Sequence, residues 1–268
     1  MTEKKLRLAV LASGGGTNLQ AILDRSRDGS LPADVVAVVS DNPGAFALER
    51  AKKSGVPAHV VEYGAGPSQE ELAGIDLAAI DRRQRILRQT DPEARLRRLA
   101  RLVAAERRLI GVLDNYAPDY ICLAGWMRLV TPYFLDRFNR EGRYGTLNIH
   151  PALLPAFPGE HGYEDTLAYG CRWGGVTVHF VDEGEDSGPV IAQAVYPIWP
   201  GDDIDAVRAR GLGLEYEVYA QCIRWLADGH VEIKQRPGSR PRVTVTDPEY
   251  GPILGGWVRR GMGWEGGA

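Results

Sequence analysis

Short apolar runs alternate with amphipathic stretches near the start of the chain. Three runs are made mainly of valine, leucine and alanine: Leu6–Ala12, Val35–Ser40 and His59–Val61. The segments between them have apolar residues at helical spacing, with Leu19, Ile22 and Leu23 in the first and a helix-like Phe46–Gly55 in the second. Strands that alternate with helices in this way are typical of parallel β-α-β units, so the pattern predicts an α/β fold.

The pattern becomes helical and rich in arginine over residues 75–115. Apolar residues recur there at helical spacing: Ile80, Leu87, Leu96, Leu99, Leu102, Val103, Leu109 and Leu113. Pro92 divides the stretch into two helices, and Asp91 is placed to cap the second. The arginines from Arg82 to Arg108 are interpreted as the solvated face of these helices.

Four further strands and one long helix are predicted in the second half of the chain. The strands are Tyr120–Ala124, Gly145–His150, Gly174–Asp182 and Val190–Pro197. A helical pattern runs from Asp203 to Asp228 and stops at Gly229, a residue type that commonly ends helices. After Ile233 the chain is rich in proline, glycine and arginine, so we expect residues 234–268 to form a tail that is only partly ordered.

Composition sets limits on the class of protein. The 268 residues are 44% hydrophobic and 25% charged, which suits one large α/β domain or a domain with an appendage. The net charge of −3 gives no general attraction to nucleic acid or to anionic membranes. No apolar run approaches the roughly 20 residues of a membrane span, and Leu6–Ala12 is too short for the apolar part of a secretory signal. We therefore expect a cytoplasmic protein without nucleic-acid or membrane partners.

The cysteines give no sign of a metal site. Cys122, Cys171 and Cys222 lie far apart in the sequence and lack the spacing of zinc ligands. They are interpreted as small buried residues in a reducing compartment, and no metal is expected.

A glycine-rich turn separates the first strand from the first helix. This glycine turn, Gly14–Asn18, offers free N–H groups at the start of a helix, which favour an anion such as phosphate. Thr17 and Asn18 could instead only cap the helix. The turn begins like a dinucleotide fingerprint, but Leu19 stands in place of its third glycine, and Asp41 could serve as a ribose acid. A phosphate ligand and a dinucleotide therefore both remain open at this point.

Asn148 and His150 form the second candidate feature. Residues two apart on a strand point to the same side, so this strand presents an amide and an imidazole together. Such a pair can bind a carbonyl oxygen and move a proton. The alternative is a structural histidine before the turn that starts at Pro151.

The third feature is an acidic turn, Asp182–Gly188, which follows a predicted strand. Asp182, Glu183 and Glu185 are interpreted as solvated acids. Asp186 differs because it precedes Ser-Gly-Pro, where the stiffened chain can aim its carboxylate. With Asn148 and His150 it would suit acyl transfer to an amine, in which the carboxylate keeps the imidazole cationic and no serine or cysteine nucleophile is needed.

Four segments together carry a resemblance to a known family. The segments are Ala12–Gln20, Ala124–Arg128, Leu147–Pro155 and Val176–Pro189. They resemble the folate-dependent formyltransferase superfamily, and the Ser-Gly-Gly-Gly-Thr-Asn turn narrows the resemblance to the glycinamide ribonucleotide branch or its hydrolase relative. The similarity covers about residues 6–61 and 115–233.

The resemblance implies a particular architecture. It implies a Rossmann-like, mostly parallel sheet with helices on both faces, in a formyltransferase domain of residues 1–233. Within that domain, a phosphate-binding half would span about 1–115 with a helical insert at about 64–113. A folate-binding and catalytic half would span about 116–233, followed by the tail at 234–268.

The resemblance also implies roles for individual residues. The catalytic residues would be Asn148, His150 and Asp186. The aminonucleotide would contact Gly16, Thr17, Asn18 and Glu215, although Glu215 could also be an exposed helix acid. The folate would contact Met127, Arg128, Leu129, Val130 and Asn148, together with the Val181–Glu185 loop. The formyl donor would be 10-formyltetrahydrofolate and the acceptor 5′-phosphoribosylglycinamide, on a monomer or homodimer without metal.

The chain departs from the family pattern in places, and these departures leave room for different activities. The insert is longer than expected, and the arginine by which the family reaches folate or phosphate could be Arg101 or Arg107. Tyr216 stands where a histidine is common. A formyltetrahydrofolate hydrolase would carry a regulatory domain before Leu6, and a tRNA formyltransferase would need an RNA-binding domain after Ile233. A formyltransferase for another phosphorylated amine, a non-catalytic nucleotide-binding module and an NAD dehydrogenase also remain open.

Overall fold

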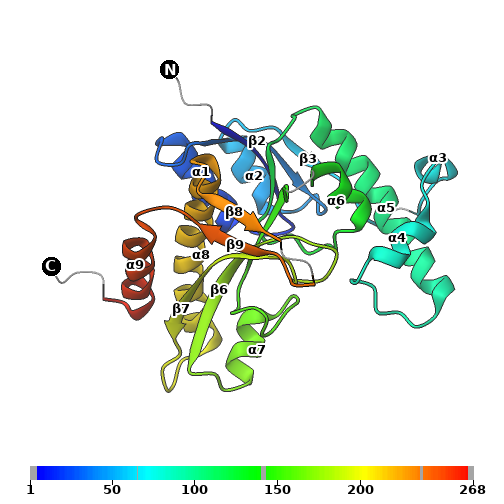
Figure 1. Ribbon diagram of the computed structural model, residues 1–268. Helices are drawn as coiled ribbons and strands as arrows, with labels where there is room; N and C mark the ends of the chain where they lie inside the picture. The colour runs from blue at the N-terminus through cyan, green and yellow to red at the C-terminus, as the bar shows by residue number, and fades with distance from the viewer. Residues whose placement is uncertain (1–4, 65, 140–142, 236–237, 265–268) are drawn as a thin grey trace.

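The computed structural model describes residues 5–64, 66–139, 143–235 and 238–264. In these residues seven strands form one sheet in the order β3-β2-β1-β4-β5-β6-β7 (Figure 1). The strands are β1 (Leu6–Leu11), β2 (Ala33–Ser40), β3 (Ala58–Val60), β4 (Tyr120–Leu123), β5 (Thr146–His150), β6 (Trp173–Phe180) and β7 (Val190–Pro197). The first five are parallel, whereas β6 pairs antiparallel with β5 and β7 pairs antiparallel with β6 at one edge. The predicted mostly parallel α/β sheet is confirmed.

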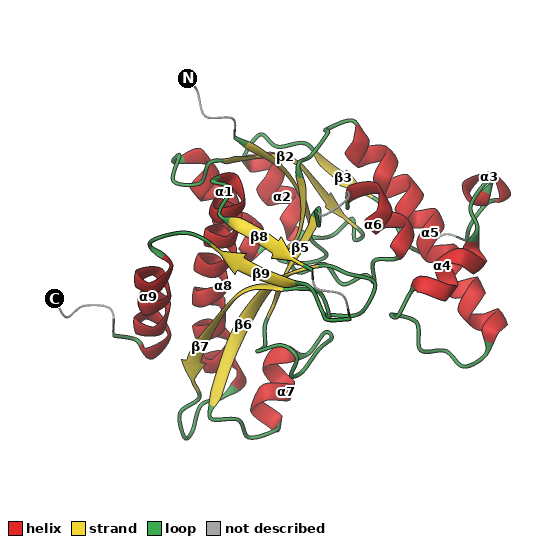
Figure 2. Cartoon of the chain, viewed as in Figure 1, coloured by secondary structure: helices red, strands yellow, loops and turns green. Residues whose placement is uncertain are grey.

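Helices cover both faces of the sheet (Figure 2). The helices are α1 (Thr17–Arg27), α2 (Phe46–Lys53), α3 (Gln69–Leu72), α4 (Leu77–Arg83), α5 (Pro92–Asp114), α6 (Pro132–Phe138), α7 (Gly162–Ala168), α8 (Ile204–Ala227) and α9 (Tyr250–Met262). On β1, Leu8 and Val10 pack in the core with α1, α2 and α8, while Ala9 and Leu11 pack in a second core with α5 and α6. Burial on both faces explains why the strands are continuously apolar rather than alternating.

The insert between β3 and β4 folds around a small core of its own. Ile80, Ile86, Leu87, Leu99 and Val103 are buried there together. The long helix α5 begins at Pro92, and the side chain of Asp91 accepts hydrogen bonds from the first turn, so the predicted break and cap are confirmed.

Most arginines of the insert are exposed, as expected for a solvated face, but several of them also form bonds within the protein. Arg95 pairs with Asp81 at 2.9 Å, and Arg108 pairs with Glu71. Arg107 donates to three backbone carbonyl groups, those of residues 70, 71 and 73. The arginine-rich pattern therefore ties the short helices of the insert to α5.

The tail is more ordered than its composition suggested. After β8 (Val231–Lys234), residues 242–245 form β9, which pairs with it, and α9 packs against α8 and β7. The helix packs four apolar residues, spaced as in an amphipathic helix, against the main core: the buried Trp257 and the partly buried Tyr250, Ile253 and Leu254. The ring centroid of Trp257 lies 5.8 Å from that of Trp225, which anchors the helix in the main core.

None of the helices in the described residues is long and apolar enough to cross a membrane. The carboxyl ends of β1, β4 and β5 meet near the middle of the sheet, where the chain leaves the strands in irregular loops. In sheets of this type, ligands bind at such an edge.

Candidate active site

A cleft of about 370 Å³ lies at the carboxyl ends of β1, β4 and β5. Its lining combines segments that are far apart in the sequence: the glycine turn, Trp126–Val130, Asn148, His150, the 184–186 part of the acidic turn, and Glu215. The cleft thus holds the proposed catalytic trio, the proposed nucleotide contacts Gly16, Thr17, Asn18 and Glu215, and the proposed folate contacts Met127–Val130. The cleft therefore defines one candidate active site.

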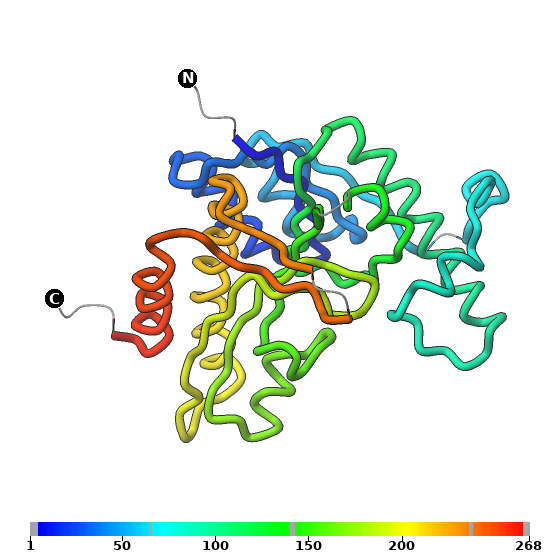
Figure 3. The backbone as a smooth tube through the Cα atoms, in the orientation of Figure 1, coloured from blue at the N-terminus to red at the C-terminus, as the bar shows by residue number. Residues whose placement is uncertain are grey.

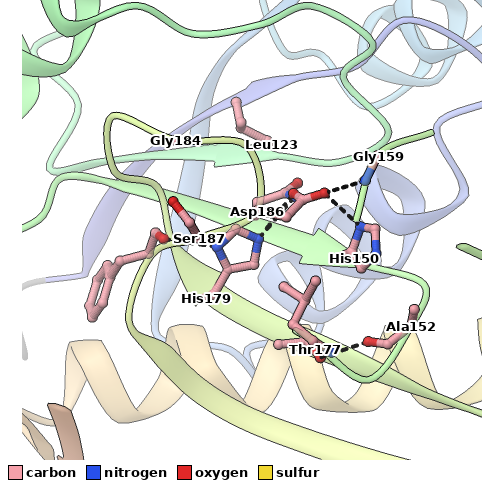
Figure 4. Close-up of polar contacts among 12 residues, drawn as sticks. Leu123, His150, Ala152, Gly159, Thr177, His179, Gly184, Asp186 and Ser187 are labelled. Atoms are coloured by element: carbon pink, nitrogen blue, oxygen red, sulfur yellow. Dashed lines mark hydrogen bonds and ion pairs between the residues drawn. The ribbon is translucent and has the colours of Figure 1, made fainter. Parts of the chain in front are cut away.

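The proposed catalytic trio lines this cleft, and Figure 4 shows the contact of His150 with Asp186. Nδ1 of His150 lies 3.3 Å from Oδ2 of Asp186, and Nδ2 of Asn148 lies 3.4 Å from Oδ1 of the same carboxylate. His150 is buried, and its Nε2 lies 2.8 Å from the carbonyl oxygen of Phe157. Both ring nitrogens therefore face an acceptor, a setting that suits an imidazole about to gain a proton.

The pKa of His150 is shifted in the direction opposite to the expectation. Burial lowers the pKa of His150, and the nearby Asp186 carboxylate only partly opposes this, so the pKa lies below its ordinary value. Burial alone would raise the pKa of Asp186, but His179, His150 and the Gly159 amide more than compensate and lower it. These directions favour a neutral imidazole beside an ionised carboxylate at neutral pH.

His179 belongs to the same centre, although nothing in its local sequence singled it out. This buried residue on β6 is paired in register with Asn148 on β5. Its Nε2 lies 3.2 Å from Nδ2 of Asn148 and 3.5 Å from Oδ1 of Asp186, while Nδ1 faces the carbonyl oxygen of Phe180 at 2.8 Å. Only the antiparallel pairing of β5 with β6 brings it there, and that pairing was the signal needed to find it.

The acidic turn is strained and tightly bonded. Asp186 has φ 47°, in the left-handed region, and its Oδ2 accepts a hydrogen bond from the Gly159 amide at 2.8 Å. Asp182 is not a solvated acid: its Oδ1 accepts from the Gly184 amide at 3.0 Å and from the Ser187 hydroxyl at 2.6 Å. Asp182 therefore shapes the turn that aims Asp186.

The glycine turn leaves the start of α1 free. Gly16 is the residue before the helix, and no side chain caps the helix there. Thr17 and Asn18 are already inside the first turn of α1, so they do not act as caps. The first amide groups of α1 are thus available to an anion at this end of the cleft.

Glu215 on α8 faces the glycine turn. It is buried, and its carboxylate accepts hydrogen bonds from the Tyr163 hydroxyl and, at 2.5 Å, from Nδ2 of Asn18. Burial raises the pKa of Glu215 above its ordinary value. The alternative of an exposed helix acid is wrong, because the carboxylate lines the cleft beside the predicted phosphate site.

The cleft is also lined by Met127, Arg128, Leu129 and Val130. Met127 is 46% exposed and offers an apolar surface to a ligand. Nε of Arg128 lies 2.5 Å from Oδ2 of Asp41, while the buried Oδ1 has no hydrogen-bond partner among the described residues. One oxygen of the candidate ribose acid is therefore paired with Arg128, and the third glycine of the dinucleotide fingerprint is absent.

A second cavity of about 660 Å³ shares Met127, Arg128 and Leu129 with the cleft. Arg98 and Arg101 also line it. Arg107, by contrast, is bonded to backbone carbonyl groups of the insert. Of the two arginines considered from the sequence, Arg101 is the one that faces a ligand cavity.

Comparison with known proteins agrees with this geometry. The chain matches the family model described as formyl transferase over residues 6–223. It is 36% identical over 230 residues to the phosphoribosylglycinamide formyltransferase of Escherichia coli (strain K12), covering 86% of this chain and 91% of that protein. Glycinamide ribonucleotide transformylase 1 from Symbiobacterium toebii matches in structure with a TM-score of 0.72 and 37% identity, covering 91% of this chain and 95% of that one. The enzyme of the same name from Geobacillus kaustophilus gives a TM-score of 0.66 and 40% identity, covering 83% and 99%.

Proposed function

Because the chain belongs to the formyl transferase family, we propose that it transfers the formyl group of 10-formyltetrahydrofolate to the amine of 5′-phosphoribosylglycinamide. The observation that carries this proposal is the set of groups that line one cleft. The glycine turn with Glu215 beside it, the Met127–Val130 segment and the trio all line it together. Such a set suits a phosphorylated amine that meets a formyl donor at the trio.

The phosphate of the aminonucleotide would bind at the glycine turn. The amide groups at the start of α1 supply hydrogen bonds and the positive end of the helix dipole. Glu215 lies within reach of that site through Asn18, and a buried carboxylate there suits the polar or cationic end of a small amine. Burial raises its pKa, so a bound cation would restore the ionised form.

The donor would occupy the part of the cleft lined by the Met127–Val130 segment. Its flat ring system would lie against the Met127–Val130 segment, and its acidic chain would extend toward Arg101 and the second cavity. Cations lining a cavity of this size favour carboxylates.

Attack of the amine on the formyl carbon creates a negative oxygen and releases a proton. Asn148 is placed to donate a hydrogen bond to that oxygen, since its present contacts at 3.2 and 3.4 Å are long and readily exchanged. The neutral His150 accepts the proton, and the resulting imidazolium is stabilised by Asp186 and by the carbonyl oxygen of Phe157. The same proton then passes to the departing donor nitrogen as the carbon–nitrogen bond breaks.

The test is to follow release of tetrahydrofolate by absorbance, with the aminonucleotide present or omitted. We expect release only when the amine is present, together with formylated nucleotide in equal amount. Release at the same rate without the amine would reassign the protein to hydrolysis of the donor. No release in either case would contradict both formyl-transfer reactions.

A further inference from the structure

The acidic turn is contacted by a segment of the insert that lies far from it in the sequence. We call residues 83–89, which run from the last residue of α4 toward α5, the strap. The Arg85 amide donates to the carbonyl oxygen of Glu183 at 2.8 Å, and Arg85 forms an isolated parallel β-bridge with Gly184. Figure 3 shows the insert lying to one side of the sheet, from which the strap reaches this turn. The backbone of the strap therefore pairs with the loop that carries Asp186.

Three arginines of the strap reinforce this pairing with three acids of the turn. The nearest nitrogen–oxygen distances are 2.7 Å for Arg83–Glu183, 3.2 Å for Arg85–Asp182 and 3.0 Å for Arg88–Glu185. Arg83 also forms a two-pronged pair with Asp136 of α6, with both distances 2.7 Å. The three acids of the turn are the ones that the sequence suggested were solvated. One exposed ion pair contributes little to stability, but three ion pairs beside a backbone β-bridge together restrict the motion of the turn.

The strap is itself held rigidly by the insert. Oε1 of the buried Gln84 accepts hydrogen bonds from the amides of Ile86 and Leu87, at 3.0 and 2.7 Å. The side chains of Ile86 and Leu87 are buried in the core of the insert. Arg95 of α5 fixes the far end by donating to the carbonyl oxygen of Gln89 at 3.0 Å. A segment anchored at both ends and in its middle can hold a neighbouring loop in place.

We propose that the strap is a positioning device for the catalytic turn, and that Arg83, Arg85 and Arg88 are positioning residues for Asp186. Asp182 connects the two, because it binds Arg85 on one side and the Gly184 amide and Ser187 hydroxyl on the other. Asp186 lies in the turn that these contacts hold, and its backbone is in the left-handed region. Such a conformation persists only when the surrounding structure enforces it. Loss of the strap contacts would let Asp186 move away from His150. The activity part of this inference rests on the proposed function.

The test uses the full chain with Arg83→Gln, Arg85→Gln and Arg88→Gln combined. We expect amide hydrogen exchange in the 181–189 peptide to rise by about tenfold, since loss of the contacts lowers the cost of local opening. We expect kcat to fall by about tenfold while the KM for the aminonucleotide changes less than about twofold. The exchange measurement does not depend on any activity, so it tests the strap even if the protein transfers no formyl group.

A matched control removes the same charge elsewhere: Arg27→Gln, Arg82→Gln and Arg97→Gln combined. Arg82 is exposed. Among the described residues, Arg27 contacts Asp24 and Ser54, and Arg97 contacts Asp91 and Glu93. None of these partners belongs to the acidic turn. The control should leave both exchange and kcat near the parent values. Equal exchange and equal kcat in the two triple variants would overturn the proposal.

A second variant covers the case in which the strap triple variant does not fold. Glu183→Gln weakens the Arg83 contact from the side of the turn and leaves the insert intact. Raised exchange in the 181–189 peptide would support the strap, and unchanged exchange with unchanged kcat would overturn it.

Discussion

The two turns that border the cleft obtain their shapes in opposite ways. The backbone of the glycine turn is shaped by elements close to it in the sequence: Gly16 adopts φ 66°, and the Gly14 carbonyl accepts from the Ala47 amide of α2 at 3.1 Å. The acidic turn is shaped by distant parts of the chain. Gly159 binds Asp186 at 2.8 Å, and the strap pairs with Glu183 and Gly184.

The difference suits what each turn is proposed to do. A phosphate needs only a set of backbone amides, and backbone geometry alone can present them. A carboxylate that must stay against one imidazole needs its side-chain direction fixed, and that requires contacts from several sides. Changes at the acidic turn should therefore act on kcat, whereas changes at the glycine turn should act on nucleotide binding.

The largest effect is expected from Asp186→Asn. The substitution keeps the shape of the side chain but removes the charge that stabilises protonated His150, so kcat should fall by about 10³-fold or more. The KM for both substrates should change by less than about threefold. Steady-state kinetics with each substrate varied in turn measures both quantities.

Asp34→Asn is a suitable control, because Asp34 is an exposed acid paired with Lys5 at 3.1 Å. It should leave kcat unchanged. Near-normal kcat in Asp186→Asn would remove Asp186 from the mechanism, and with it the comparison between the two turns.

Gly16→Ala is expected to have the next largest effect, this time on binding. A Cβ atom at Gly16 would lie 2.8 Å from the Cβ atom of Ala47, and φ 66° is unfavourable for alanine. The KM for the aminonucleotide should rise about tenfold while kcat changes little, and the strain should lower the free energy of unfolding by roughly 1–3 kcal/mol.

Gly15→Ala provides the matched control. A Cβ atom at Gly15 would meet nothing within 4 Å, and its φ is not in the left-handed region. Steady-state kinetics gives the KM for the aminonucleotide in both variants, and thermal unfolding compares their stability. Equal effects of the two substitutions would mean that the close approach to Ala47 is not what matters at this turn.

The features that were predictable from the sequence are local ones. Strands such as Leu6–Ala12 follow from continuous apolar runs, and the start of α5 follows from Asp91 and Pro92. Asn148 and His150 were predictable as a pair because two residues of one strand share a face. Each of these signals lies within a few residues of the feature that it predicts.

The features that were missed depend on contacts between distant segments. His179 enters the site only because β6 pairs with β5 in one register. The ordered α9 was hidden by the glycine and proline content around it, although Tyr250 and Trp257 mark its apolar face. The neutral state of His150 could not be inferred either, because burial, which lowers its pKa, depends on the packing of the whole cleft.

Asp182→Ala should have a smaller effect than the first two substitutions. It removes the acceptor of the Gly184 amide and the Ser187 hydroxyl, and it also removes the partner of Arg85. The strap would still hold the turn through Glu183, so kcat should fall only about fivefold, equivalent to roughly 1 kcal/mol. Single-turnover kinetics gives this value directly, and a loss as large as that of Asp186→Asn would mean that the turn depends on Asp182 alone.

The smallest expected effect is a shift in the pH dependence of kcat. The proposed base is neutral His150, whose pKa burial holds below the ordinary value of 6.5. Activity should therefore be constant at neutral pH and fall as the pH decreases through this lowered pKa, because protonated His150 cannot accept the proton of the amine. Asp186 raises the pKa of His150, so any variant that moves or neutralises Asp186 should shift this acidic limb of the pH profile to lower pH, by about one unit or less for the strap variants.

Gly16→Ala should leave the acidic limb of the pH profile in place, since the glycine turn carries no group that contacts His150. Profiles of kcat from about pH 5 to 8 for the parent, the strap triple variant and Gly16→Ala measure the shift. A limb that moves equally in both variants, or that lies above the ordinary value of 6.5 in the parent, would contradict the assignment of His150 as the neutral base.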